Sequence, residues 1–509
     1  MENYDLFIFV SEPNLVRFGF SKQGEQSAMK QLIIAATASL ALSTPTLAPA
    51  QQVRSISASD KAQGAKAHPE LLQQFGGAYR GPQAAYVEKV GKRIALQSGL
   101  SNSERDFTVT LLDSPVNNAF AIPGGYVYVT RQLLALMNDE AELASVLGHE
   151  IGHVAARHSN KRNSTSTLGS ILAAGVGVLT GSSELGQIAG YGAQLYTLRF
   201  SRTQEYAADD LGIRYLKGAG YDPYAAADML TKLNAMAVVD AQLAGKDANA
   251  VPSWASTHPN TADRVARARK QAQAVSAGQG KGIRNREAFL AAIDGVRYDD
   301  DPRQGIIDGQ NFKHPELKLA FTAPQGYAIA NSPTAVSVSG SGGQAQFQGG
   351  KIGGEGLDGY VDKVFQALGG GKTRVEHGDI RSTTVNGIDA SYAVARANSQ
   401  SGPVDVTVFA YRFAPDIAYH FVTITAQGSG LGAFVPLVDS FRRIGESESA
   451  SVKPRRIQVV EVKSGDTLTS LANRMAYSSY RMERFLALNG LTAETRLRPG
   501  DKVKLVVLG

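Results

Sequence analysis

Cysteine is absent from the 509 residues of this chain. Disulfide bonds, cysteine nucleophiles and thiolate metal sites are therefore excluded, and any metal ion must be held by histidine, aspartate or glutamate. Histidine is also scarce, with 8 in the whole chain. Because histidine is this rare, a regular spacing between two of them seldom arises by chance.

A dense block of lysine and arginine with interleaved aromatic residues is missing as well, so we expect no nucleic-acid partner. Lys and Arg total 52 against 46 Asp and Glu, which leaves a net charge of +6. Such a mild excess suits contact with anionic surfaces such as a membrane or a cell wall. Hydrophobic residues make up 43 % of the chain, which is typical of globular proteins.

The apolar run near the N-terminus, Leu32 to Leu42, is too short to span a bilayer comfortably. Met29-Lys30-Gln31 precedes this run and Ala48-Pro49-Ala50 follows it, which is the pattern of a signal peptide with its cleavage site. We interpret residues 1–50 as an N-terminal extension and signal peptide, with Met29 as the true start. An uncleaved N-terminal anchor is the alternative. Either interpretation predicts export, and export without cysteine suits a bacterial periplasm.

A chain of this length predicts two to four domains, and its patterns favour a multidomain α+β fold. Residues 69–274 are mostly helical, with a strand-rich patch at 107–129. Residues 312–444 mix alternating runs with helical stretches, which predicts an α+β domain. Residues 457–509 predict a small β-α-α-β module. The stretches between these regions are predicted to be linkers: 51–68, 275–311 and 445–456.

The segment His149-Glu150-Ile151-Gly152-His153 has the pattern HExxH. In a helix, residues i and i+4 share a face, so both imidazoles can point at one metal ion. Glu150 is then placed to accept a proton from a water molecule at that ion. Asn138 as a cap and the apolar residues 143, 147, 151 and 154 support a helix here. A helix with two solvated histidines is the alternative.

A second helix is predicted to begin at Ser201, where Ser201 and Gln204 form a capping box, and to end near Gly218. Glu205 lies in its first turn and Asp209 one turn later on the same face. Two histidines and one glutamate are a known catalytic zinc arrangement with an open fourth position. Asp209 would accept the far N–H of a ligand histidine. On spacing alone, an ordinary solvated helix face would explain Glu205 and Asp209 better.

Four motifs in order resemble one family, and together they cover residues 69–270. HExxH followed by SRxxExxAD at 201–209 is similar to the zinc metallopeptidases related to the CAAX prenyl endopeptidase and the heat-shock membrane protease HtpX. The segment Asn118–Gly125 resembles the family's edge strand beside the active-site cleft. The segment Ser256–Pro259 with Arg264 resembles its THPxxxxR element.

The resemblance implies a mainly helical, zincin-type metalloprotease domain of the gluzincin class, in its periplasmic bacterial subgroup. It also implies roles for residues of this chain. The implied residues are His149, His153 and Glu205 as ligands of Zn²⁺; Glu150 as the catalytic base; Asp209 behind a ligand histidine; and Asn118, Ala119 and Phe120 as the strand that holds the substrate.

His258 allows three interpretations. The resemblance to soluble relatives implies an extra, switchable ligand that blocks the open zinc position. The same imidazole in a catalytic role would stabilise the transition-state oxyanion. A histidine that merely anchors a loop is the third possibility. The cluster of His158, Lys161 and Arg162 is interpreted as a solvated helix end.

Between the two metal-binding helices, residues 168–198 are rich in glycine, alanine and leucine. We interpret them as a lid or plug over the cleft with possible membrane contact. A plain buried hairpin explains the composition equally well.

The final module resembles a LysM domain. The resemblance rests on the SGDTL motif at 464–468, Asn489-Gly490-Leu491 and the LRPGDKVKL motif at 497–505. Such modules hold glycans that contain N-acetylglucosamine, so the resemblance implies peptidoglycan as a partner. A LysM-like fold kept only for protein contacts is the alternative.

Taken together, the patterns predict a periplasmic zinc endopeptidase that hydrolyses misfolded or misassembled cell-envelope proteins and is tethered to peptidoglycan. Its partners would be protein or peptide substrates and the wall. A wall-anchored chaperone or binding protein with latent protease activity is the first alternative, and a peptidoglycan hydrolase is the second.

Overall fold

The computed structural model describes residues 55–158, 200–243, 258, 262–276, 282–333, 335–368, 375–399 and 402–509. The predicted signal peptide and the 168–198 segment lie outside these residues. The multidomain α+β fold class is confirmed, with helices dominating up to residue 293 and strands dominating from 297 to 443. Within the described ranges, no helix combines the length and the apolar character that crossing a membrane requires.

A three-stranded sheet lies near the start of the described chain, after α1 (Ala58–Gln74) and α2 (Pro82–Ala95). Its strands are β1 (Thr108–Leu112), β2 (Ala119–Ile122) and β3 (Tyr126–Thr130), in the order β1-β3-β2. β3 runs parallel to β1 and antiparallel to β2. In the described part of the chain, β2 is therefore an edge strand with one unpaired side.

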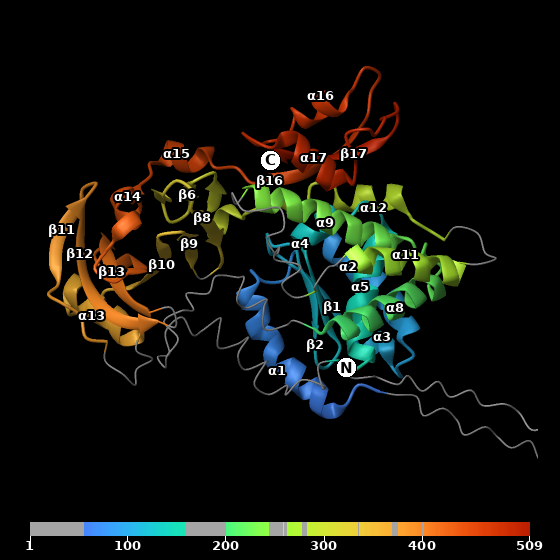
Figure 1. The fold of residues 1–509 in the computed structure, drawn as a ribbon, viewed down its shortest axis with the longest axis horizontal. Helices are drawn as coiled ribbons and strands as arrows, with labels where there is room; N and C mark the ends of the chain where they lie inside the picture. The colour runs from blue at the N-terminus through green and yellow to red at the C-terminus, as the bar shows by residue number, and fades with distance from the viewer. Residues whose placement is uncertain are drawn as a thin grey trace, which may run out of the picture. The chain divides into compact units, whose positions relative to one another are not determined.

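Glycines allow two central helices to approach closely. α5 (Glu140–Ala155) packs along α8 (Arg202–Gly218), and the two run side by side in Figure 1. A β-carbon on Gly148 would lie 3.3 Å from the Cα atom of Gly212, and one on Gly212 would lie 3.0 Å from the backbone nitrogen of His149. Larger side chains at these positions would push the helices apart.

Among the described residues, five further α-helices belong to this helical region: α3 (Ser103–Asp106), α4 (Arg131–Leu136), α9 (Ala225–Leu243), α11 (Ala262–Ser276) and α12 (Arg286–Ile293). α12 differs from the sequence-based expectation, because it lies in the stretch 275–311 that was predicted to be a linker. Its Phe289, Leu290 and Ile293 are fully buried in the core. These residues share one face of a single short helix, a pattern too brief to stand out among the polar residues around it.

Residues 306–443 form two sheets around two apolar cores. The larger sheet has the order β11-β12-β13-β14-β10-β9-β8, and α13 (Gly356–Leu368) covers one face through Val361 and Phe365. The smaller sheet has the order β15-β7-β6-β5 and closes the other core with α14 (Val435–Asp439). The strands are β5 (Ile306–Asp308), β6 (Asn311–His314), β7 (Leu319–Thr322), β8 (Ala328–Asn331), β9 (Val336–Gly340), β10 (Gly343–Lys351), β11 (Arg381–Val385), β12 (Ile388–Ser399), β13 (Gly402–Ala414), β14 (Ile417–Ala426) and β15 (Arg442–Arg443).

The C-terminal module has the predicted β-α-α-β order, with β16 (Arg455–Glu461), α16 (Leu468–Ala472), α17 (Arg481–Asn489) and β17 (Lys502–Leu508). Its apolar residues belong to the same hydrophobic core as those of α2, α4 and α5. β16 pairs with β17 and also with β4 (Arg297–Tyr298), which lies outside the module. The stretch 445–456, which was predicted to be a linker, contains the short helix α15 (Glu446–Ser451) and the start of β16.

Lys504 fastens this module to the helical region. Its side chain is fully buried and donates hydrogen bonds to the carbonyl oxygens of Ala135 (2.7 Å) and Met137 (2.6 Å). Both carbonyls lie at the C-terminal end of α4, where a helix leaves acceptors without intrahelical partners. Nearby, the Asn138 amide donates to the backbone oxygen of Asn489 at 2.6 Å. Burial lowers the pKa of the Lys504 ammonium well below its usual value.

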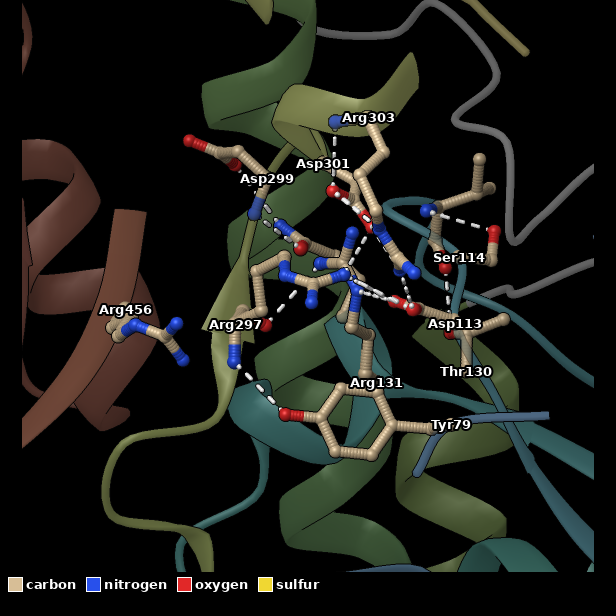
Figure 2. A network of polar contacts seen from close by, with 12 residues as sticks. Tyr79, Asp113, Ser114, Thr130, Arg131, Arg297, Asp299, Asp301, Arg303 and Arg456 are labelled. Atoms are coloured by element: carbon tan, nitrogen blue, oxygen red, sulfur yellow. Dashed lines mark hydrogen bonds and ion pairs between the residues drawn. The ribbon is translucent and has the colours of Figure 1, made fainter. Parts of the chain in front are cut away.

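A second junction is polar and is drawn in Figure 2. Asp113, just after β1, accepts from Arg131 Nε at 2.7 Å and from Arg297 Nη1 at 3.0 Å. Arg303 joins the same carboxylate at 3.1 Å and pairs with Asp301 at 2.5 Å. Because Arg131 is fully buried, losing one partner would leave an uncompensated charge. The network therefore fixes residues 297–303 against the first sheet.

Candidate active site

α5 carries three of the predicted site residues on one helix. Its N-cap is Asp139, whose side chain accepts from the Glu142 backbone N–H, and Glu140 and Glu142 lie in the first turn. The sequence-based assignment of Asn138 as the cap is wrong, because the Asn138 amide bonds to Asn489 instead. Acidic groups at this end complement the helix dipole and help to fix the helix start.

His149 and His153 point to one place. Their Nε2 atoms lie 3.0 Å apart, and both side chains are buried, at 7 % and 1 % exposure. The i, i+4 spacing therefore brings two imidazole nitrogens together, as the HExxH pattern predicts.

Glu205 comes from α8, where the capping box between Ser201 and Gln204 fixes the first turn. Its Oε2 atom lies 3.5 Å from His149 Nε2, and its Oε1 atom lies 3.6 Å from His153 Nε2. The close packing of α5 against α8 thus places the Glu205 carboxylate next to the two imidazoles.

His258 completes the cluster. Its Nδ1 atom lies 3.2 Å from both carboxylate oxygens of Glu205 and 3.4 Å from His149 Nε2. One ligand atom from each of His149, His153, Glu205 and His258 lies within 4.8 Å of all the others, so the four could hold a metal ion.

This donor set fits zinc. Imidazole nitrogen and carboxylate oxygen are ordinary zinc ligands, and tetrahedral bonds of 2.0–2.1 Å place neighbouring donor atoms about 3.3–3.4 Å apart. The two Nε2 atoms lie 3.0 Å apart, His153 Nε2 lies 3.6 Å from Glu205, and all four ligand atoms lie within 4.8 Å of one another. Little rearrangement would be needed for these atoms to surround one ion.

Asp209 and Arg264 support the cluster from behind. The Asp209 carboxylate lies 2.9 Å from His149 Nδ1, which leaves Nε2 as the atom that faces the cluster. Arg264 donates to both oxygens of Asp209, at 2.9 and 2.7 Å, and its Nη1 lies 2.9 Å from Glu205 Oε2. Burial alone would raise the pKa of Asp209, but Arg264 and His149 outweigh it, so this pKa is lowered. Arg264 thus links Asp209, which orients the predicted ligand His149, to the predicted ligand Glu205.

His158 lies close to the site, although the sequence suggested a solvated helix end. It is 3 % exposed, and its Nδ1 atom lies 2.9 Å from His153 Nδ1. The HExxH spacing gave no hint of this contact, because His158 follows the end of α5 in a turn where Arg157 has a positive φ of 54°. That change of backbone direction returns the chain toward His153.

Glu150 lies beside the cluster and is shielded from solvent. It is 1 % exposed, and its Oε1 atom lies 3.6 Å from His258 Nε2. Its Oε2 atom is buried and has no hydrogen-bond partner among the described residues. Burial raises the pKa of this carboxyl group above its usual value.

Of the predicted strand residues, Ala119 lies at the cluster. Its carbonyl oxygen is 3.3 Å from His258 Nε2. The carbonyl of Asn118 instead accepts from Thr130 N–H on β3 at 3.0 Å. Because backbone groups alternate along a strand, the groups of Ala119 face the unpaired side of β2. The Phe120 side chain points away into an apolar cluster with Phe75 and Tyr128.

Comparison with known proteins identifies two domains. Residues 82–272 match peptidase family M48, and residues 460–506 match the LysM domain. The chain therefore contains an M48 peptidase domain, which includes every residue of the cluster, and a C-terminal LysM domain. These matches confirm both resemblances that the motifs indicated.

Curated relatives are similar to part of this chain. The chain is 32 % identical over 212 residues to mitochondrial metalloendopeptidase OMA1 of Schizosaccharomyces pombe, covering 40 % of this chain and 59 % of that protein. It is 32 % identical over 198 residues to the beta-barrel assembly-enhancing protease of Escherichia coli K12, covering 37 % and 38 %. Metalloprotease LoiP of the same strain is 36 % identical over 120 residues, covering 23 % and 47 %. The chain thus spans between 38 % and 59 % of the length of these relatives.

Proposed function

Starting from the M48 peptidase domain, we propose that this chain is a zinc-dependent endopeptidase of the bacterial cell envelope that cleaves misfolded or misassembled proteins. The observation that carries the proposal is the convergence of three imidazoles and one carboxylate beside Glu150, a buried carboxyl group with an unpaired oxygen. The name of one relative, the beta-barrel assembly-enhancing protease, favours envelope proteins as substrates.

His149, His153 and Glu205 would hold the zinc ion, with Asp209 fixing the orientation of His149. When bound, the ion would polarise a water molecule and the carbonyl group of the scissile peptide. Glu150 would accept the proton of the attacking water at Oε2 and pass it to the leaving amine nitrogen.

The substrate would bind as an added strand on the free edge of β2. The backbone groups of Ala119 face that side. In such complexes, main-chain hydrogen bonds supply affinity without selecting particular substrate side chains. Asn118, just before β2, is proposed to set the register of the strand, because its carbonyl oxygen accepts a hydrogen bond from Thr130 N–H.

His258 is proposed to block the resting enzyme. Its Nδ1 atom lies among the ligand atoms, and its Nε2 atom contacts the same Ala119 carbonyl that a substrate strand would use. A substrate would therefore compete with His258 for the strand and for the open metal position. This contact also favours the second candidate function, a binding protein whose protease activity is latent.

His258→Ala is expected to cleave casein severalfold faster than the parent protein, because the variant removes the group that occupies the site. Initial rates at equal zinc content measure the effect, and His377→Ala in the β-rich region is the matched control. A slower variant with unchanged zinc would contradict blocking and indicate oxyanion stabilisation. An unchanged rate would leave only a loop-anchoring role.

Glu205→Ala is expected to weaken zinc binding by more than about 100-fold, because only imidazole ligands remain, while Asp209→Asn should cost about 10- to 100-fold. Competition with a fluorescent zinc chelator measures both affinities, and the exposed Glu70→Ala serves as the control. Parental affinity in Glu205→Ala would reject this carboxylate as a ligand.

The LysM domain is proposed to attach the enzyme to peptidoglycan. Two of its connecting loops, 463–467 and 492–500, are largely exposed, while α17 and β17 face the core shared with α5. The docked module thus keeps a free surface for a glycan. Attachment of this kind, together with the predicted signal peptide, supports a periplasmic location.

The full chain is expected to sediment with purified peptidoglycan and to be released by soluble N-acetylglucosamine oligomers, which would compete for the same surface. The fraction of protein in the pellet gives the result. Failure to sediment would favour the alternative of a LysM fold used for protein contacts. Peptidoglycan fragments released beside uncleaved casein would instead identify a wall hydrolase.

A further inference from the structure

The two histidines of the HExxH motif are supported by different kinds of group. A neutral imidazole that binds a metal ion through Nε2 carries its hydrogen on Nδ1, and this N–H needs an acceptor. At His149 the acceptor is the Asp209 carboxylate, 2.9 Å from Nδ1. At His153 the atom that lies within reach of Nδ1 is Nδ1 of His158, at 2.9 Å. One predicted ligand is therefore supported by a carboxylate and the other by a further imidazole.

The backbone turn after α5 determines where His158 lies. The His158 N–H donates to the carbonyl oxygen of His153 at 3.0 Å, and the Arg157 N–H donates to that of Val154 at 3.0 Å. With the left-handed backbone of Arg157, at a φ of 54°, these bonds form a Schellman motif. Glycine is the usual residue at this position, so an arginine held there indicates that the surrounding contacts impose the turn. The strained turn is what brings His158 back beside His153.

A second contact ties this turn to the start of α8. Gln204, a member of the capping box, donates from Nε2 to the carbonyl oxygen of His158 at 3.3 Å. The next residue is Glu205, the predicted carboxylate ligand. The backbone of His158 is thus held both by the end of α5 and by the start of α8, the two helices that supply the predicted zinc ligands.

The surroundings favour an acceptor without charge. The Phe200 ring stacks on His153, with ring centroids 3.8 Å apart and an angle of 21° between the planes, and its centroid lies 6.1 Å from that of His158. All three side chains are at most 6 % exposed. Burying a charged acceptor against this aromatic ring would cost more free energy than burying a neutral one. A neutral imidazole therefore fits this place better than a second carboxylate would.

We propose that His158 is a positioning residue for zinc. It accepts the Nδ1–H of His153 at its own Nδ1 atom, and it thereby fixes the ring that presents Nε2 to the metal. His158 then carries its own hydrogen on Nε2 and adds no charge to the cluster. The inference rests on the proposed zinc peptidase function, and it adds a support for His153 that matches the support of His149 by Asp209.

Two substitutions at this position separate hydrogen bonding from packing. His158→Asn keeps an acceptor, because Oδ1 of asparagine is as many bonds from Cβ as Nδ1 of histidine. His158→Leu keeps a side chain branched at Cγ but has no acceptor. His420→Ala is the matched control, since it removes another buried histidine, one that bonds to Tyr360 in the β-rich region. Competition of each full-length protein with a fluorescent zinc chelator gives the affinities.

His158→Leu is expected to weaken zinc binding by about 10- to 100-fold, while His158→Asn stays within about threefold of the parent. His420→Ala should keep the parental affinity. Parental affinity in His158→Leu, or equal weakening in the Leu and Asn variants, would overturn the positioning role and leave the peptidase proposal intact. A parent protein that binds no zinc would overturn the proposed function, and this inference with it.

A measurement on the parent protein decides the matter if His158→Leu does not fold. NMR spectra of the zinc-loaded chain with nitrogen-15 in its histidines report which ring nitrogen carries hydrogen. We expect His153 to carry hydrogen on Nδ1, and His158 to carry hydrogen on Nε2 with Nδ1 bare. A hydrogen on Nδ1 of His158 in the zinc-loaded protein would overturn the proposal.

Discussion

Replacing Glu150 by glutamine is expected to lower the rate of casein cleavage by about 10²- to 10⁴-fold while zinc stays bound. The amide keeps the shape of the carboxyl group but cannot accept the proton of the attacking water. Glu150 is not among the atoms that converge on the metal position, so metal binding should persist. Initial rates and metal content measured on one preparation give both numbers.

The matched control for this change is Glu88→Gln on the exposed face of α2, which should behave as the parent protein does. Near-parental cleavage by Glu150→Gln with zinc retained would contradict the assigned base. Loss of zinc from this variant would show that Glu150 acts as a ligand instead.

Removing residues 455–509 is expected to unfold the peptidase domain as well as the wall-binding module. The deletion exposes apolar residues of α4 and α9 that now pack on α17, and it removes the strand with which β4 pairs. Since whole domains are stable by only about 5–15 kcal/mol, an exposed core of this kind should give insoluble protein. Solubility and thermal unfolding of the truncated chain test the expectation.

A point substitution tests the same junction without removing the module. Lys504→Ala removes two buried hydrogen bonds and opens a cavity, so the free energy of unfolding should fall by about 3–5 kcal/mol. Lys463→Ala, on an exposed loop of the same module, should change it by less than about 0.5 kcal/mol. A truncated chain that stays soluble, with parental melting temperature and casein cleavage, would contradict the shared core.

Local spacing predicts the parts of the site that lie on one helix. His149 and His153 needed only the i, i+4 rule, and the capping box at Ser201 placed the start of α8. Glu205 was different, because its spacing alone favoured a solvated face. The resemblance of four ordered motifs singled it out, and the close packing at Gly148 and Gly212 explains physically how it reaches the histidines.

The rest depends on contacts between residues far apart in the chain. Lys504 looks like an ordinary strand lysine, and only the end of α4 beside it makes it a buried anchor. Arg264 belonged to a recognised motif, yet its bonds to Asp209 and Glu205 are 55 or more positions away. His158 was interpreted as part of a solvated helix end and α12 as part of a linker, because a single turn or a short helix carries too little periodicity to separate from a polar stretch.

The metal content of the purified chain, followed through a chelator titration of casein cleavage, tests directly whether the cluster holds a catalytic zinc ion. We expect about one zinc ion per chain, loss of cleavage as zinc is withdrawn, and recovery when zinc is restored. A chain that binds no zinc, or that cleaves casein equally well after complete removal of metal, would contradict this expectation.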